Sequence, residues 1–381
     1  MRDNYDYQEL LVNGDISEID PLVDELITIE EDRQARKLIL IPSESVSPLP
    51  VRDALGSVFN NVYAEGYPRD VMREELEENM ADLTRQFTHY RRYANRRFYK
   101  GTELVDMVES LAGIRAKQAH ATEEVPAEDI YVNVQPLSGT PANLAVYDSF
   151  VEPGGTVMGL ALDEGGHLSH GSQFNLTGKR YNIVSYSTDP HTGKLDYNEI
   201  RDQALEHEPE MIIAGYTSFS WAPDWDKFAE IADEVGAVLL ADIAHVAGMS
   251  IAGAYPSPIG KADVVMHTTH KTLAGPRGAV VLTTDKDKMD VLDEAIFPGA
   301  QGGPHPNKFA AMAVAFKIAQ TETYQELQYQ TVKNAKVLAE ALKERDLTLA
   351  YGGTDTHLMV INLKELEQEL DFKPMGEIAS R

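Results

Sequence analysis

Short apolar runs and longer amphipathic stretches alternate along the middle of the chain, from about Asp106 to Arg345. The apolar runs have the length of strands, and the stretches between them have the length of helices. Such alternation predicts an α/β fold, with βαβ units in a mostly parallel sheet and helices on both of its faces. The strands predicted in this way cover residues 129–134, 156–160, 211–214, 237–240 and 262–266.

The pattern changes near Phe309, where a long helical stretch begins and is followed by a strand-like run, HLMVINL, at 357–363. We therefore expect a large domain over residues 36–308 and a small C-terminal α+β domain over 309–381. The small domain looks incomplete, because 364–381 resembles the opening of an element whose partners are missing. Residues 1–35 are acidic and predict an N-terminal arm or helix, and the highly charged segment 69–97 predicts a helical insertion in the large domain.

Length, composition and charge narrow the class of protein. A chain of 381 residues exceeds what one core usually supports. No apolar run is long enough to span a membrane, the N-terminus is too polar for a signal peptide, and there is no cysteine for a disulfide or thiolate metal site. A net charge of −27 repels nucleic acid and anionic membranes. We expect a cytoplasmic protein without a metal site.

The sequence HTTHKTLAGPRGA at 267–279 contains the candidate nucleophile. A strand-like run ends at Thr268 and Thr269 and is followed by His270 and Lys271 in a loop rich in Gly and Pro. A lysine placed after a buried strand loses its proton more easily and can then attack an aldehyde. A lone loop lysine is more often simply exposed, so the flanking sequence carries this prediction.

Two further motifs lie where ligands bind in open α/β sheets, beyond the carboxyl ends of strands. In GAVLLADIAHVAG, Asp242 and His245 follow an apolar run, and a carboxylate there can pair with a protonated pyridine nitrogen. Asp242 could instead cap a helix, and His245 could be a packed structural residue. In the run 129–150, Ser138, Gly139 and Thr140 lie at a predicted helix start, where they form either an anion site or a simple N-cap.

Two weaker motifs gain meaning only in combination with these. In DEGGHLSHG, the pair Gly165–Gly166 precedes His167, whose imidazole can stack on a cofactor ring or lie at the surface. In VYAEGYP, Tyr63 and Glu65 place a hydroxyl and a carboxylate two residues apart, which alone indicates only a turn with aromatic residues.

Together these segments resemble the serine hydroxymethyltransferase (glycine hydroxymethyltransferase) family across roughly residues 35–365. Nine stretches match in the family's order: PSES (42–45), NVYAEGYP (61–68), FYKGTELVDMVE (98–109), VQPLSGTPAN (134–143), GGHLSHGS (165–172), DIAHVAG (242–248), THKTLAGPRGA (269–279), FPGAQGGP (297–304) and GGTDTHL (352–358). The resemblance implies the aminotransferase-like, pyridoxal-phosphate fold type I. It also implies a homodimer or larger assembly, with two active sites per dimer at the subunit interface.

The resemblance also implies roles for individual residues around pyridoxal 5'-phosphate. Lys271 would hold the cofactor as a Schiff base, and Asp242 would pair with the pyridine nitrogen. The other implied cofactor residues are His167 on the ring, His245 and Thr217 near its phenolic oxygen, Ser138, Gly139, Thr140 and His270 at the phosphate, Thr268 beside the Schiff base, and Tyr63 and Gly303 from the neighbouring subunit. Those implied for the substrate and the folate are Glu65 as general acid/base, Ser43, Tyr99 and Arg277 around the substrate, and Leu162, Gly165, Gly166 and Leu168 at the folate.

The implied reaction is the reversible transfer of the serine hydroxymethyl group to tetrahydrofolate or a related pterin, which leaves glycine. Two alternatives remain: a folate-independent aldolase or transaldolase acting on β-hydroxy amino acids, and an inactive subunit that needs a second chain. The second has a specific reason. The family anchors the substrate carboxylate with an arginine in an SGIR-like motif, which this sequence lacks, and Arg381 does not have that context. A fragment or a split chain is therefore expected.

One departure from the family is an insertion. The family's GYP and YYGG motifs are nearly adjacent, whereas residues 69–97 separate Pro68 from the matching FYKG segment here. Such an insertion could form a lid, bind a partner or decorate the surface. The pair Asp163–Glu164 replaces a usual Ala-His pair beside the Gly165–Gly166 loop, which leaves the identity of the pterin open.

Overall fold

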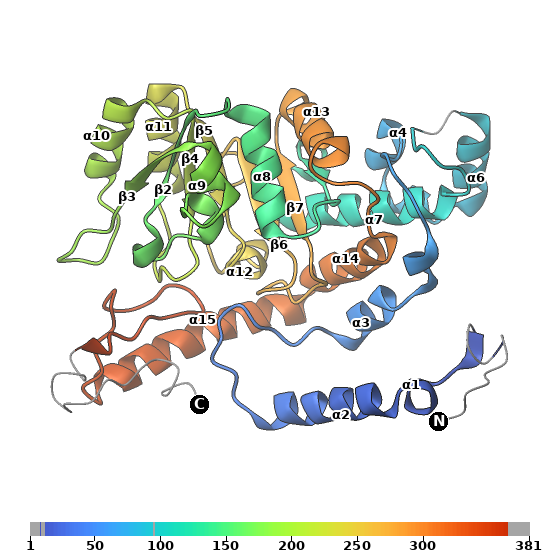
Figure 1. Cartoon of the computed structure of the whole chain (residues 1–381), viewed down its shortest axis with the longest axis horizontal. Coiled ribbons are helices and arrows are strands. Elements are labelled where there is room, and N and C mark those ends of the chain that lie inside the picture. The colour runs from blue at the N-terminus through green and yellow to red at the C-terminus, as the bar shows by residue number, and fades with distance from the viewer. Residues whose placement is uncertain (1–7, 9–11, 94–95, 365–381) are drawn as a thin grey trace. The chain divides into compact units, whose positions relative to one another are not determined.

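The computed structural model describes residues 8, 12–93 and 96–364 of the chain (Figure 1). The chain divides into residues 1–41 and a body that begins at Pro42. In the first unit, Asp15 and Asp20 accept hydrogen bonds from the first turns of α1 (Ile16–Ile19) and α2 (Pro21–Arg36), as N-caps do. The N-terminal arm predicted over 1–35 lies partly outside the described residues and stays a prediction.

The described part of the body contains a seven-stranded sheet in the order β1-β7-β6-β5-β4-β2-β3. Neighbouring strands are parallel except for β7, which pairs antiparallel with both β1 and β6. The predicted α/β class and mostly parallel sheet are therefore confirmed, although two strands, β3 and β7, were not predicted. The strands are β1 (Tyr131–Asn133), β2 (Thr156–Leu160), β3 (Asn182–Tyr186), β4 (Met211–Gly215), β5 (Val238–Asp242), β6 (Val264–Thr268) and β7 (Ala279–Thr283).

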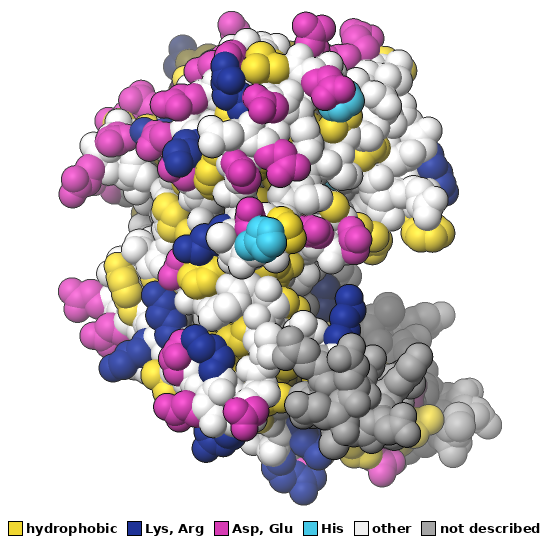
Figure 2. Space-filling model, turned by 90° about the vertical axis from the view of Figure 1, so that its left-hand side faces the viewer, with side chains coloured by type: hydrophobic (Ala, Val, Ile, Leu, Met, Phe, Trp, Pro, Cys, Tyr) yellow, Lys and Arg dark blue, Asp and Glu magenta, His cyan; other side chains and the backbone are white. Residues whose placement is uncertain are grey.

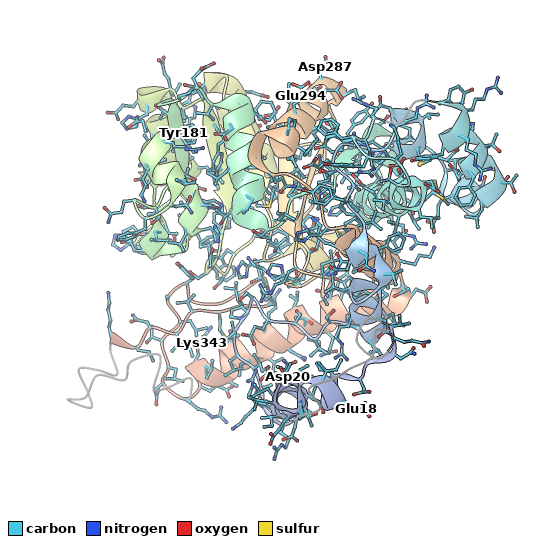
Figure 3. All side chains as sticks on the ribbon, turned by 45° about the vertical axis from the view of Figure 1, so that its right-hand side comes forward. Glu18, Asp20, Tyr181, Asp287, Glu294 and Lys343 are labelled. Carbon is cyan, nitrogen blue, oxygen red and sulfur yellow. The ribbon has the colours of Figure 1, made fainter. Side chains whose placement is uncertain are left out.

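Helices cover the sheet and extend beyond it (Figure 1). Asp287 and Glu294, which Figure 3 labels, lie near the two ends of α13. The helices of the body are α3 (Leu49–Leu55), α4 (Asp70–Arg73), α5 (Glu77–Met80), α6 (Leu83–Arg92), α7 (Glu103–His120), α8 (Gly139–Phe150), α9 (Leu176–Arg180), α10 (Tyr197–His207), α11 (Trp225–Val235), α12 (Ala247–Ile251), α13 (Lys286–Glu294), α14 (Pro306–Ala319) and α15 (Glu322–Lys343).

The central strands are buried on both faces, as the uninterrupted apolar runs require. In β4, Met211 and Ile213 pack into a core shared with α8 and α13. Ile212 and Ala214 point to the other face and join a core that includes α7, α11 and α14. Successive strand residues therefore contribute to opposite layers, which holds the strand ends rigidly in place.

The insertion 69–97 contains three short helices, α4, α5 and α6, which pack against α7 (Figure 1). Two of its arginine side chains are largely buried. Arg73 forms an ion pair with Asp293 of α13 and donates to the Val132 carbonyl at 3.0 Å. The side chain of Arg97 is completely buried. The insertion is thus joined to the core at both of its ends.

The C-terminal part of the body begins with α14, which packs against α7 and α3, and continues with α15. The predicted strand at 357–363 is wrong within the described residues. It forms only an isolated bridge between Leu349 and Ile361. Residues 365–381, including Arg381, lie outside the described residues, and the small C-terminal domain stays a prediction.

Acidic side chains dominate the face that carries α10 and α11, as Figure 2 shows in magenta. Exposed members of this group are Glu199, Asp202, Glu206, Glu230, Asp233 and Glu234. None of the described helices is long and apolar enough to cross a membrane.

Candidate active site

Five parallel strands end at one edge of the sheet, and the loops that follow them meet there. A cavity of about 180 Å³ lies between these loops. Every residue predicted to bind the cofactor lines this cavity except Tyr63 and Gly303. Those that line it are Ser138, Gly139, Thr140, His167, Thr217, Asp242, His245, Thr268, His270 and Lys271, together with Asn143, His170, Tyr216, Ala244 and Met266.

Asp242, the last residue of β5, is the negative charge of the cavity. Its Oδ2 accepts hydrogen bonds from Asn143 Nδ2 and His170 Nε2, both at 2.9 Å, and its Oδ1 accepts from the Ala244 amide at 3.1 Å. Burial alone raises the pKa of this carboxyl, but the hydrogen bond from His170 and the remaining donors outweigh it and hold the pKa below its usual range. Asp242 is therefore an ionised carboxylate inside the protein. It caps no helix, because α12 begins only at Ala247.

The hydrogen bonds of two histidines fix their tautomers. His170 Nδ1 accepts from the His167 amide at 3.3 Å, so its Nε2 carries the proton that is donated to Asp242. His167 Nδ1 accepts from the Ser169 amide at 3.2 Å, and burial lowers the pKa of His167 to about 4. His167 thus presents a neutral imidazole to the cavity.

Lys271 lies in the cavity and is 8 % exposed. Burial lowers the pKa of its ammonium, while the charge of Asp242 acts in the opposite direction. A larger share of neutral amine follows at a given pH, and the neutral amine is the form that attacks carbonyl carbon.

The loop around Lys271 is held from two sides. Thr272 donates its hydroxyl to the His245 carbonyl at 2.9 Å and accepts at the same oxygen from the Gly248 amide at 3.0 Å. Its own carbonyl accepts from Tyr324 of α15 at 2.9 Å. These contacts fix the backbone next to Lys271, so the position of its side chain does not depend on a free loop.

The start of α8 offers unsatisfied donors. Ser138 is the N-cap residue, but its side chain makes no capping hydrogen bond, so its hydroxyl and the first amides of this helix are available to an anion. Other buried polar atoms on the cavity wall also have no partner among the described residues: Thr217 Oγ1, His245 Nδ1 and His270 Nδ1. Buried polar atoms are normally paired, so the unpaired atoms of this wall indicate a binding site for a polar ligand.

These features fit pyridoxal phosphate. The molecule combines an aldehyde, a basic ring nitrogen and a phosphate, and the cavity supplies an amine, an ionised carboxylate and a helix N-terminus. Among the described residues, no cluster of three or more His, Asp and Glu side chains could hold a metal ion.

A second group of predicted residues gathers outside this cavity. Tyr63 donates to Glu65 Oε1 at 3.4 Å and contacts the ring of Tyr99 edge-on at a centroid distance of 5.4 Å. Gly303 lies against Tyr63 so closely that an added Cβ would sit 2.9 Å from Tyr63 Cζ. Tyr63 and Tyr99 are exposed, at 59 % and 49 %. The structure thus brings Tyr63, Glu65, Tyr99 and Gly303 together, but away from Lys271 of the same chain.

The remaining predicted residues lie in loops near the cavity. The Gly165 carbonyl accepts from the Thr217 amide at 2.7 Å, which ties the predicted folate loop to the cavity wall. In that loop Leu162 and Leu168 are half exposed, and Gly166 packs on the Leu160 carbonyl with no room for a Cβ.

Two predicted substrate residues occupy different surroundings. Arg277 is exposed, in the loop that follows Lys271. Ser43 follows Pro42, whose carbonyl contacts His357 Nε2 at 3.1 Å, and His357 stacks on His245 with 5.8 Å between ring centroids. Ser43 therefore lies close to the wall of the cavity without lining it.

Three polar residues that contact the predicted site residues were not predicted from the sequence: Asn143, His170 and His357. Asn143 and His170 hold the carboxylate of Asp242, and His357 covers His245. All three lie inside the segments that carried the family resemblance, VQPLSGTPAN, GGHLSHGS and GGTDTHL. Their signal was a polar side chain within a matching motif, and nothing in the sequence indicated which partner each would find.

A buried lysine and an ionised aspartate at the carboxyl edge of this sheet define the class of protein: an α/β protein of the aminotransferase-like, pyridoxal-phosphate fold type I. The family model for serine hydroxymethyltransferase matches residues 16–73 and 71–375. The two matches adjoin at the start of the insertion. The chain belongs to the serine hydroxymethyltransferase family.

Two relatives show how far the similarity extends. The chain is 44% identical over 344 residues to "Serine hydroxymethyltransferase" of Desulfotalea psychrophila, a match that covers 90% of this chain and 73% of that protein. It is 43% identical over 371 residues to the protein of the same name from Methanosarcina barkeri, a match that covers 96% of this chain and 82% of that protein.

Proposed function

We propose that this chain catalyses the reversible transfer of the serine hydroxymethyl group to tetrahydrofolate or a related pterin, giving glycine, with pyridoxal 5'-phosphate as cofactor. The observation that carries the proposal is the pairing of Lys271, a buried amine with a lowered pKa, with Asp242, a buried carboxylate that stays ionised, in one cavity. Family membership supplies the reaction.

Each residue of the cavity would bind a particular part of the cofactor. Ser138, Gly139, Thr140 and His270 would bind the phosphate, because they surround the open N-terminus of α8. Asp242 would keep a proton on the ring nitrogen, and the neutral imidazole of His167 would lie on the ring. The unpaired Thr217 Oγ1 and His245 Nδ1 would meet the phenolic oxygen, and Thr268 would lie beside Lys271. When bound, pyridoxal phosphate supplies an electron sink for negative charge at the amino acid Cα.

The protein's own groups then supply the reactive amine, the fixed negative charge and the general acid/base. Lys271 would hold the cofactor through its amine, whose neutral form burial favours. Asp242 remains negative throughout, since its hydrogen bonds from His170 and Asn143 stabilise the charged form. Glu65 acts as general acid/base on the substrate hydroxyl, with Tyr63 donating to its carboxylate. Ser43, Tyr99 and Arg277 would contact the substrate.

We infer that Tyr63, Glu65, Tyr99 and Gly303 serve the active site of a second copy of the chain. They form one group with two exposed tyrosines and do not line the cavity of their own chain, and enzymes of this fold build active sites between subunits. The pterin would bind over the loop of Leu162, Gly165, Gly166 and Leu168, whose two leucines are exposed beside that cavity.

The choice of lysine is tested by Lys271→Ala. After borohydride reduction with pyridoxal phosphate, intact-mass spectrometry should find the covalent adduct in the wild type and in Lys317→Ala, an exposed lysine of α14, but not in Lys271→Ala. An adduct that persists in Lys271→Ala would show that another lysine is the reactive one.

The reaction is tested with serine as the substrate of the purified chain. We expect glycine to form only when tetrahydrofolate is present. Glycine formed equally well without any pterin would favour a folate-independent aldolase, and no turnover by a chain that binds the cofactor would favour a subunit that needs a second chain.

A further inference from the structure

Lys308 is a buried cation with no role in the proposed reaction. It lies in the first turn of α14 and is 2 % exposed. Its Nζ donates to the carbonyls of Gln135 and Pro136, both at 2.8 Å. Among the described residues it forms no ion pair. Burial lowers the pKa of its ammonium to about 7, against a weaker opposing effect of Glu109.

The two carbonyls do not depend on this amine, which also lies 5.5 Å from the centroid of the Phe309 ring. The Gln135 carbonyl also accepts from Gln301 Nε2 at 2.9 Å, and the Pro136 carbonyl also accepts from the Ala279 amide at 3.1 Å. Without Lys308, both carbonyls would still have a donor. A buried ammonium without a carboxylate partner is costly, so hydrogen bonding to these carbonyls does not explain its presence.

The position of Lys308 is informative. The carbonyls that it contacts belong to the short segment that leads directly into Ser138 and the N-terminus of α8. Gly278 makes room for its aliphatic stem, because an added Cβ there would lie 2.8 Å from Lys308 Cδ. A helix N-terminus already carries partial positive charge. A second positive charge behind it is unfavourable unless an anion lies at the helix end.

We propose that Lys308 is the buried counter-charge for the phosphate group that binds at the N-terminus of α8. It raises the affinity for that group from behind the binding loop, without lining the cavity, and is therefore a positioning residue. This inference rests on the proposed function, because the phosphate belongs to the cofactor assigned there.

Two forms of the cofactor separate this role from a structural one. Pyridoxal phosphate and pyridoxal differ only in the phosphate, and their dissociation constants can be measured by absorbance with the wild type, Lys308→Met and Lys308→Gln. The methionine variant removes the charge at similar length, and the glutamine variant retains a neutral donor. Lys317→Met is the control, because Lys317 lies on the same helix but is exposed and paired with Glu77. Melting temperatures of the apo-proteins show which variants fold.

Both Lys308 variants should bind pyridoxal phosphate at least roughly tenfold more weakly, because a close opposite charge is lost in a poorly solvated place. Their affinity for pyridoxal should change by less than about twofold, since pyridoxal lacks the charged group that Lys308 attracts. Equal weakening for both ligands would make Lys308 a structural residue, and unchanged affinity for pyridoxal phosphate would remove it from the site; either result overturns the proposal. A wild type that binds neither ligand would instead contradict the proposed function. If Lys308→Met does not fold, Lys308→Gln decides the question.

Discussion

Arg97 joins the insertion to the loop that carries Glu65, and its replacement by methionine should strongly destabilise the protein. Its guanidinium pairs with Asp106 and, at 2.6 Å, with Glu109, and it donates to the carbonyls of Ala64 at 2.7 Å and Gly66 at 3.0 Å. The change to methionine removes the guanidinium that pairs with both buried carboxylates. Breaking a buried ion pair in this way costs about 3–5 kcal/mol, a large part of the roughly 5–15 kcal/mol by which proteins are stable.

The free energy of unfolding can be measured by urea denaturation of the apo-protein. Arg96→Met is the matched control, because Arg96 is the adjacent residue and forms an exposed ion pair with Asp70; its loss should cost less than about 1 kcal/mol. In the triple variant Arg97→Met, Asp106→Asn, Glu109→Gln, no charge remains unpaired, and most of the lost stability should return. If Arg97→Met is no less stable than Arg96→Met, the reasoning about buried charge is refuted.

Two further predictions concern charge in the interior. Asp242→Asn keeps the shape of the side chain but removes the negative charge. Pyridoxal phosphate should therefore bind at least about tenfold more weakly in an absorbance titration. An affinity equal to that of the wild type would contradict the pairing of Asp242 with the ring nitrogen. Burial lowers the pKa of His120 to about 4 and that of His267 to about 3, so the unfolded chain binds more protons below pH 6.5. The free energy of unfolding should fall as the pH drops from 6.5 towards 4, by up to about 3 kcal/mol for each histidine. In acid-denaturation curves, His120→Gln should show a shallower fall than the wild type. An equal dependence on pH in the two proteins would contradict this linkage.

Apolar patterning predicted five of the seven strands and failed for β3 and β7. The five predicted runs correspond to β1, β2, β4, β5 and β6. β3 pairs only with β2 and lies at the edge of the sheet, where Asn182 and Ser185 are exposed and interrupt the apolar pattern. β7 follows β6 without a helix between them, so the alternation that reveals βαβ units gives no signal for it.

Most of the cofactor residues lie at or just after the end of a strand, and strand ends converge in a parallel sheet. Their individual roles were predicted from the resemblance to the family. The partners of these residues were not predictable in the same way. Asn143 in α8 and His170, at the end of a short 3-10 helix, are separated from Asp242 by 99 and 72 residues in the sequence. A contact between residues so far apart has no local pattern. Lys308 lies just before the helical stretch predicted from Phe309 onwards, and its burial follows from the packing of α14 against α7 and α3.

Burial sets the direction of the pKa shift for Lys271 and His167, whereas hydrogen bonds set it for Asp242. Burial disfavours the charged forms of Lys271, His167 and Asp242 alike. Only Asp242 is surrounded by donors, from Asn143, His170 and the Ala244 amide, and it therefore remains ionised while the pKa values of the other two fall. The His167 amide holds His170 in the tautomer that donates to this carboxylate. A fixed negative charge beside an amine of lowered pKa suits a ligand that joins a basic ring nitrogen to an aldehyde. The His167 amide, in the loop after β2, contributes to this selection because it orients the histidine that donates to Asp242.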